Sequence, residues 1–129
     1  MLILTIRTDK PEAELGLYDD VHQLAYVTWL AHRELAETIQ QQLGDLLKSK
    51  GKSLNDLEAV VVYQGPGSFT GLRIGISIAN ALAYSLDVPI VAEGREWIQA
   101  GIARLLAGDV DELALPEYGS LPNITQQRK

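Results

Sequence analysis

The chain has 129 residues, of which 47% are hydrophobic and 22% charged, and this length and composition are typical of one globular domain with its own core. The absence of cysteine excludes thiolate chemistry, cysteine-ligated zinc sites and a disulfide framework. The formal net charge of -6 disfavours unaided binding to nucleic acid, because proteins that grip phosphate backbones normally carry a basic surface.

The first thirty residues alternate between β-forming runs and short polar links. The runs Leu2–Ile6, Ala13–Tyr18 and Gln23–Trp29 predict three strands of an antiparallel meander. The opening run lacks a basic leader and a cleavage site, and no run approaches the roughly 18 apolar residues of a membrane span. We therefore expect a soluble, cytoplasmic protein that does not associate with membranes.

Helical periodicity replaces this alternation from residue 31 onward. Ala31–Lys48 is predicted to be an amphipathic helix that ends at a left-handed Gly51. Ser53–Leu57 indicates a turn or a short helical piece, and Glu58–Tyr63 indicates a strand covered on both faces. The apolar residues of the helix recur at three- and four-residue steps: Leu35, Ile39, Leu43, Leu46 and Leu47.

Two further helices and one strand complete the predicted domain. A helix runs from about Thr70 to Leu86, a strand over Val88–Ala92 and a third helix over Arg95–Leu106. The order β-β-β-α-β-α-β-α predicts an α/β fold with a mixed sheet of about five strands and three helices. Residues 1–108 form this domain, and residues 109–129 form a C-terminal tail that either lies on the domain or stays mobile.

A glycine-rich loop over residues 64–75 joins a buried strand to a helix, the place where α/β proteins bind anions. Gly65, Gly67 and Ser68 are candidate phosphate contacts, although the spacing matches neither a Walker loop nor the dinucleotide-binding fingerprint. Alternatively, small residues at every fourth position let the helix approach a sheet or another helix closely, and Ser68 or Thr70 caps its N-terminus. These small residues are Gly67, Gly71, Gly75, Ala79 and Ala83.

The helix after this loop has apolar residues on two roughly opposite faces. One apolar face consists of Leu72, Ile76, Ala79, Ala83 and Leu86. The other apolar face consists of Ile74, Ile78, Ala81 and Leu82. The remaining residues form a narrow polar stripe: Arg73, Ser77, Asn80 and Tyr84. Because a helix that covers one side of a sheet needs one apolar stripe, the second is covered either by the tail and neighbouring helices or by a partner chain. We predict a partner, and the predicted interface residues are Arg73, Ile74, Ile78, Ala81 and Leu82.

A resemblance to a known family is carried by the stretch QGPGSFTGLRIG, residues 64–75. It resembles the signature of the TsaB (YeaZ-type) family, subunits of the bacterial machinery that makes threonylcarbamoyladenosine in tRNA. The resemblance extends from Met1 to about Leu106 and implies one lobe of the RNase H-like fold, of the actin/Hsp70/sugar-kinase type.

The resemblance also implies a non-catalytic subunit that forms dimers largely through helices of this lobe. The expected partner is a TsaD-like catalytic paralogue, or a second copy when the subunit is isolated, and the assembly engages a TsaE-like ATPase. No cofactor and no direct contact with tRNA are expected of this subunit.

Two features depart from the family pattern. Arg7-Thr8-Asp9 stands where relatives usually carry Asp-Thr-Ser, and this removes a plausible magnesium-facing carboxylate. A second lobe of roughly equal size is missing, whereas Leu115–Tyr118 resembles the C-terminal end of the family. We therefore expect a naturally shortened form.

Residues suited to catalysis or metal binding are sparse. His32 matches one of the two metal-binding histidines of the catalytic paralogue, and one imidazole makes no site, which leaves a capping or interface role. His22 is expected at the surface in a turn, and Ser68 has no candidate base. Five acidic residues near the sheet edge indicate either a solvated edge or a patch for a basic partner: Asp9, Glu12, Glu14, Asp19 and Asp20.

The sequence thus predicts a dimerisation or scaffold subunit, not an enzyme, that supports a TsaD-like catalytic partner. The alternative is a nucleotide-binding enzyme that uses the loop over residues 65–75. A third possibility is a degenerate paralogue without a role in tRNA modification.

Overall fold

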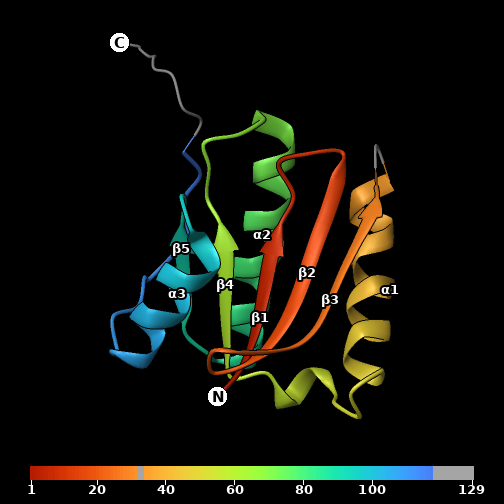
Figure 1. Cartoon of the computed structure of the whole chain (residues 1–129). Coiled ribbons are helices and arrows are strands. Elements are labelled where there is room, and N and C mark those ends of the chain that lie inside the picture. The colour runs from red at the N-terminus through yellow and green to blue at the C-terminus, as the bar shows by residue number, and fades with distance from the viewer. Residues whose placement is uncertain (32–33, 118–129) are drawn as a thin grey trace.

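Five strands form one mixed sheet in the spatial order β3-β2-β1-β4-β5 (Figure 1). The computed structural model describes residues 1–31 and 34–117. The first three strands form an antiparallel meander, and the last two are parallel to β1. The strands are β1 (Leu2–Arg7), β2 (Glu12–Asp19), β3 (His22–Leu30), β4 (Ala59–Tyr63) and β5 (Ile90–Glu93).

Three α-helices cover the two faces of this sheet (Figure 1). They are α1 (Leu35–Lys48), α2 (Phe69–Leu86) and α3 (Trp97–Leu106), and a short 3-10 helix, η2, spans Leu54–Asp56. α1 and α2 lie on one face and α3 on the other (Figure 1). The predicted element order, the mixed sheet and the number of helices are confirmed.

β4 is the most deeply buried strand, because helices cover both of its faces. Every one of its residues is buried. Val61 lies against Gly101 of α3, and Tyr63 packs edge-on against Trp97 with ring centres 6.0 Å apart. Since side chains alternate along a strand, Val60 faces α2 on the opposite side. The prediction of a strand covered on both faces is confirmed.

Several predicted boundaries are wrong by a few residues, each for a local reason. The first helix begins at Leu35 and not at Ala31, because the Ala31 N–H still donates to the Pro11 carbonyl. β5 begins at Ile90, since the Val88 N–H donates to the Ala83 carbonyl at the end of α2. The third helix begins at Trp97, after Glu96 with a positive φ of 53°. By contrast, Gly51 is left-handed as predicted, with φ 66°.

The segment 109–117, here called the strap, packs on the domain from the edge of β5 to the glycine-rich loop. Asp111 pairs with Ile90, and its carboxylate accepts a hydrogen bond of 2.8 Å from the Ala92 N–H. At its far end, the Glu117 N–H donates to the Gln64 carbonyl. Of the two predicted alternatives for the tail, contact with the domain is therefore correct for residues 109–117, and residues 118–129 lie outside the described residues.

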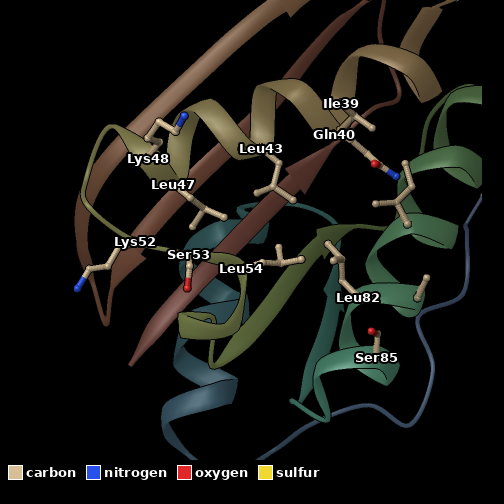
Figure 2. Close-up of a pocket in the computed structure, with 13 residues that line it drawn as sticks. Ile39, Gln40, Leu43, Leu47, Lys48, Lys52, Ser53, Leu54, Leu82 and Ser85 are labelled. Carbon is tan, nitrogen blue, oxygen red and sulfur yellow. The ribbon is translucent and has the colours of Figure 1, made fainter.

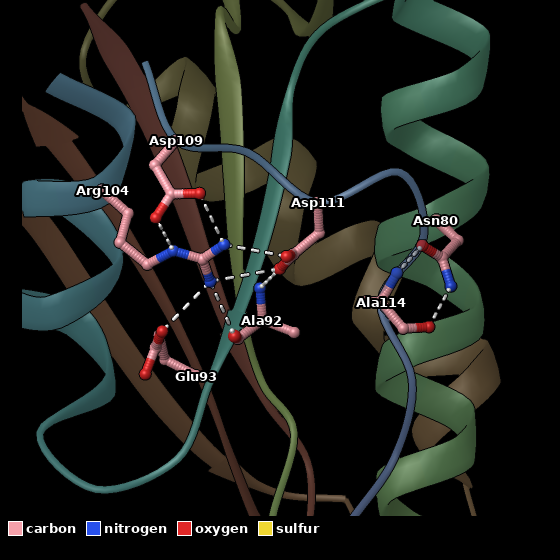
Figure 3. A network of polar contacts seen from close by, with 7 residues as sticks. All are labelled: Asn80, Ala92, Glu93, Arg104, Asp109, Asp111 and Ala114. Atoms are coloured by element: carbon pink, nitrogen blue, oxygen red, sulfur yellow. Dashed lines mark hydrogen bonds and ion pairs between the residues drawn. The ribbon is translucent and has the colours of Figure 1, made fainter. Parts of the chain in front are cut away.

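Two polar groups of the domain hold the strap (Figure 3). Arg104 of α3 forms ion pairs with Glu93, Asp109 and Asp111 at 2.8–3.0 Å. Asn80 of α2 both donates to and accepts from the backbone of one strap residue, Ala114, at 3.0 and 2.9 Å. Ala114 is only 2% exposed, so these hydrogen bonds satisfy backbone groups that are withdrawn from water.

Candidate partner interface

A groove of about 540 Å³ lies between α1 and α2, and η2 closes one end of it (Figure 2). Its apolar lining residues are Ile39, Leu43 and Leu47 of α1, Leu54 of η2, and Ile78, Ala81 and Leu82 of α2. Polar side chains at its rim are those of Gln40, Lys48, Lys52, Ser53 and Ser85. Figure 2 shows Leu43, Leu54 and Leu82 directed toward one another across the groove.

A smaller hollow of about 390 Å³ continues this groove toward the N-terminus of α2. It is lined by Ala36, Thr70, Arg73, Ile74, Ser77 and Ile78. Because Ile78 lines both, the two hollows form one surface along α2, which we call the α1–α2 groove.

All five predicted interface residues line the α1–α2 groove. Ile78, Ala81 and Leu82 lie in its larger part, and Arg73 and Ile74 lie in its smaller part. The opposite wall, which is formed by residues of α1, was not predicted from the sequence. The spacing of Ile39, Leu43 and Leu47, one every four residues, predicted that these side chains are buried. It did not indicate that the same side chains also line a groove.

The two apolar faces of α2 have different environments. Leu72, Ile76 and Ala79 pack on the sheet and are at most 4% exposed. Ile74, Ile78 and Leu82 contact the core and remain half-buried at the groove. The strap contacts α2 at Asn80. Within the described part of the chain the groove side of α2 is left open, and Tyr84 on the polar stripe is also exposed.

The glycine-rich loop is packed tightly against the end of β1. The Thr8 hydroxyl donates to the Gly71 carbonyl at 2.6 Å. A side chain at Gly71 or Gly75 would collide with Thr8, and one at Gly65 would collide with the Glu117 carbonyl of the strap. The structural interpretation of the small residues is therefore correct, because Gly71 and Gly75 allow α2 to approach β1.

An anion at this loop would meet a carboxylate that is already in place. Asp9 lies against Gly67, and its side chain is 7% exposed and accepts a hydrogen bond of 2.7 Å from Arg7. The Arg7 guanidinium also lies 3.8 Å from the ring centre of Tyr63. Arg7, which departs from the family pattern, is thus paired within the chain, and the Asp9 side chain already occupies the space beside Gly67.

Ser68 occupies the N-cap position of α2, but its hydroxyl makes no capping hydrogen bond. The hydroxyl lies beside Gly71, the third residue of α2, but without the geometry of a capping hydrogen bond. The predicted capping role is therefore wrong for the Ser68 side chain.

The histidines and the acidic residues do not form a site in the described part of the chain. No group of three His, Cys, Asp or Glu side chains within residues 1–31 and 34–117 is arranged to hold a metal ion. His32 lies outside the described residues, and His22 is exposed but begins β3, where a turn was predicted. No described helix has the length and apolar character needed to cross a membrane.

The five acidic residues predicted as one cluster lie at opposite ends of β2. Asp19 and Asp20 form ion pairs with the N-terminal amine of Met1. At the other end, Glu14 pairs with Lys10 and accepts a hydrogen bond from Tyr26. The prediction of a single patch is wrong, because an eight-residue strand holds its two ends roughly 23 Å apart.

Comparison with known proteins identifies the family. The family model for TsaD, tRNA N6-adenosine threonylcarbamoyltransferase, matches residues 27–93, more than half of the chain. The chain belongs to this family. Its relatives include the tRNA threonylcarbamoyladenosine biosynthesis protein TsaB of Escherichia coli, which is 36% identical over 115 residues. That match covers 83% of this chain and 49% of the relative, and it confirms the predicted resemblance to TsaB-type members of the family.

Solved structures agree with this assignment. YeaZ from Pseudomonas aeruginosa superposes with a TM-score of 0.67 at 28% identity, over 83% of this chain and 50% of that one. RuvC of T. thermophilus shares the fold, with a TM-score of 0.54 at 16% identity over 92% of this chain and 85% of that one. The predicted RNase H-like lobe is confirmed. The chain spans about half the length of the TsaB and YeaZ relatives it matches.

Proposed function

We propose that this chain is a non-catalytic accessory subunit in tRNA N6-threonylcarbamoyladenosine biosynthesis and binds a TsaD-like catalytic partner through the α1–α2 groove. The observation that carries the proposal is the row of half-buried apolar side chains on α2, which the described chain leaves uncovered. Family membership and the name of the TsaB relative supply the pathway.

The shape of the groove favours a helix as its occupant. Ile74, Ile78 and Leu82 recur every four residues along one wall, and the opposite wall repeats the same spacing. Two helices with apolar edges form the hole into which side chains of a third helix insert, and the result resembles a helix bundle. A paralogue with the same lobe would offer such a helix, and so would a second copy of this chain, which accounts for the homodimer expected in isolation.

The accessory role divides the chemistry between subunits. A TsaD-like partner would supply the catalytic site and contact tRNA, because this chain carries a net charge of -6. A TsaE-like ATPase would join the assembly formed by the two. This role implies a cytoplasmic protein.

The rival function, nucleotide binding at the glycine-rich loop, is disfavoured by the buried Asp9 carboxylate beside Gly67 and by the contact between Thr8 and Gly71. Calorimetry separates the two proposals. Titration of the purified chain with a TsaD-like protein from the same source is expected to release heat with 1:1 stoichiometry, whereas titration with ATP and magnesium is expected to give none. Micromolar affinity for ATP in the absence of a partner would favour the rival, and failure to bind the TsaD-like protein would favour the degenerate paralogue.

A further inference from the structure

The two edges of the sheet differ in whether the described part of the chain covers them. The strap covers the edge of β5, where the Asp111 N–H donates to the Ile90 carbonyl at 2.9 Å and the Asp111 carboxylate accepts from the Ala92 N–H. At the opposite edge, no strand of residues 1–31 or 34–117 pairs with the outer side of β3. The backbone groups on that side are therefore available to another strand.

The β3 edge lacks most of the features that usually prevent pairing between proteins. Natural edge strands are short, carry lysine, proline or inward-pointing charges, or contain a bulge. β3 is nine residues long, and its sequence HQLAYVTWL contains no Asp, Glu, Lys, Arg or Pro. The irregularity in its pairing with β2 lies between Leu17 and Tyr18, toward the start of β3, so the strand is regular from Ala25 onward.

We propose that the β3 edge pairs antiparallel with β3 of a second copy of this chain, joining the two sheets into one. A second copy is favoured because it presents the same free edge, so that one contact satisfies both. The chain as a whole has a charge of -6, yet pairing through this uncharged strand places no like charges opposite each other. Antiparallel pairing of identical strands also has the two-fold symmetry of most homodimers.

The central residues of β3 suit such pairing. With the two-fold axis at Tyr26, this residue would pair with its own copy and Ala25 would pair with Val27. Tyr26 and Val27 are aromatic and β-branched residues, which favour strands. The Tyr26 ring lies against Gly16 and its hydroxyl donates to Glu14, so this side chain leans over β2 and leaves the outer backbone of β3 clear.

The absence of cysteine allows a sharp test by single-cysteine scanning across residues 24–28. Paired strands lie about 4.8 Å apart, so a residue on the two-fold axis lies within the roughly 4.4–6.8 Å between Cα atoms that a disulfide spans. One residue from the axis, the distance to its own copy rises to about 8 Å, beyond this reach. Mild oxidation is therefore expected to give covalent dimer at one position, with a steep fall on either side.

The scan uses the Ile78→Glu background, in which contact through the α1–α2 groove is removed. Any remaining self-association then tests the β3 edge independently of the proposed function of the groove. Ala103→Cys, on the exposed surface of α3, is the control that measures how much cross-linking arises from random collision. Thr28→Lys, at an exposed position of β3, is expected to weaken self-association in that background at least ten-fold without changing the melting temperature by more than about 2 °C.

Uniform cross-linking across residues 24–28, or none above the Ala103→Cys level, would overturn the proposal. A sedimentation profile of pure monomer at roughly 100 μM for the Ile78→Glu variant would do the same. In either case, the edge would be left for an extended segment of a different protein.

Discussion

Removing the amide of Asn80 should release the strap from α2. This side chain forms two hydrogen bonds with the Ala114 backbone, one through its amide group and one through its carbonyl oxygen (Figure 3). In Asn80→Ala both bonds are lost, and Ala114 must either leave its N–H and carbonyl unpaired or move into water. The experiment therefore asks whether the strap is an integral part of the domain.

The expected cost is about 1.5 kcal/mol. Two hydrogen bonds contribute roughly 1 kcal/mol each to stability, and the better helix propensity of alanine offsets about 0.5 kcal/mol. At roughly 2.1 cal/mol/K for each of 129 residues, the entropy of unfolding is about 0.27 kcal/mol/K. The melting temperature should therefore fall by about 5–6 °C.

Thermal unfolding followed by circular dichroism measures this change, with Ser77→Ala as the matched control. Ser77 is exposed, lies one turn earlier on the same helix and gains the same kind of propensity. The melting temperature of the Ser77→Ala variant should not fall. Equal melting temperatures for the two variants, together with unchanged hydrogen exchange at the Ala114 N–H, would refute the role assigned to Asn80.

Two other predictions concern the packing of the loop and the pH dependence of stability. Gly71→Ala should cost about 2–3 kcal/mol in urea unfolding, since its methyl group meets the Thr8 carbonyl oxygen, whereas Gly44→Ala, with nothing within 4 Å, should stabilise by up to about 1 kcal/mol. Burial raises the pKa of Asp111, but hydrogen bonds from Arg104 and a backbone N–H outweigh burial and lower the pKa below its ordinary value. The carboxylate thus adds stability above about pH 4 that is lost as the pH falls through the lowered pKa, so Asp111→Asn should flatten the loss of stability between pH 5 and pH 2.5. Equal losses of stability between pH 5 and pH 2.5 in wild type and Asp111→Asn would contradict this role of Asp111.

Local sequence patterns were sufficient to predict the sheet and the helices. The β-branched run at β4 and the four-residue spacing in α1 each depend on neighbours a few positions away. The start of α1 was predicted too early, because the bond between Ala31 and Pro11 joins residues twenty positions apart. Helix periodicity carries no information about such a contact.

The strap and the α1 wall of the groove depend on contacts distant in sequence. Asn80 and Ala114 are 34 residues apart, and the sequence around Ala114 has no periodic pattern that indicates burial. On α2, the surplus apolar face predicted an interface, and its residues do line the groove. The opposite wall could not be predicted, because only the packing of α1 across the sheet brings Leu43 opposite Leu82.

The most direct test of the proposed function is the affinity of the full chain for a TsaD-like protein from the same source, measured for wild type, Ile78→Glu and Ala103→Glu. Ile78 is half-buried in the middle of the groove, and Ala103 is exposed on the other face of the sheet. A carboxylate buried in an apolar contact costs several kcal/mol, so Ile78→Glu should weaken binding at least 100-fold while the circular dichroism spectrum stays unchanged. Ala103→Glu should bind as wild type does. Binding by Ile78→Glu within three-fold of wild type would contradict the placement of the partner in the α1–α2 groove.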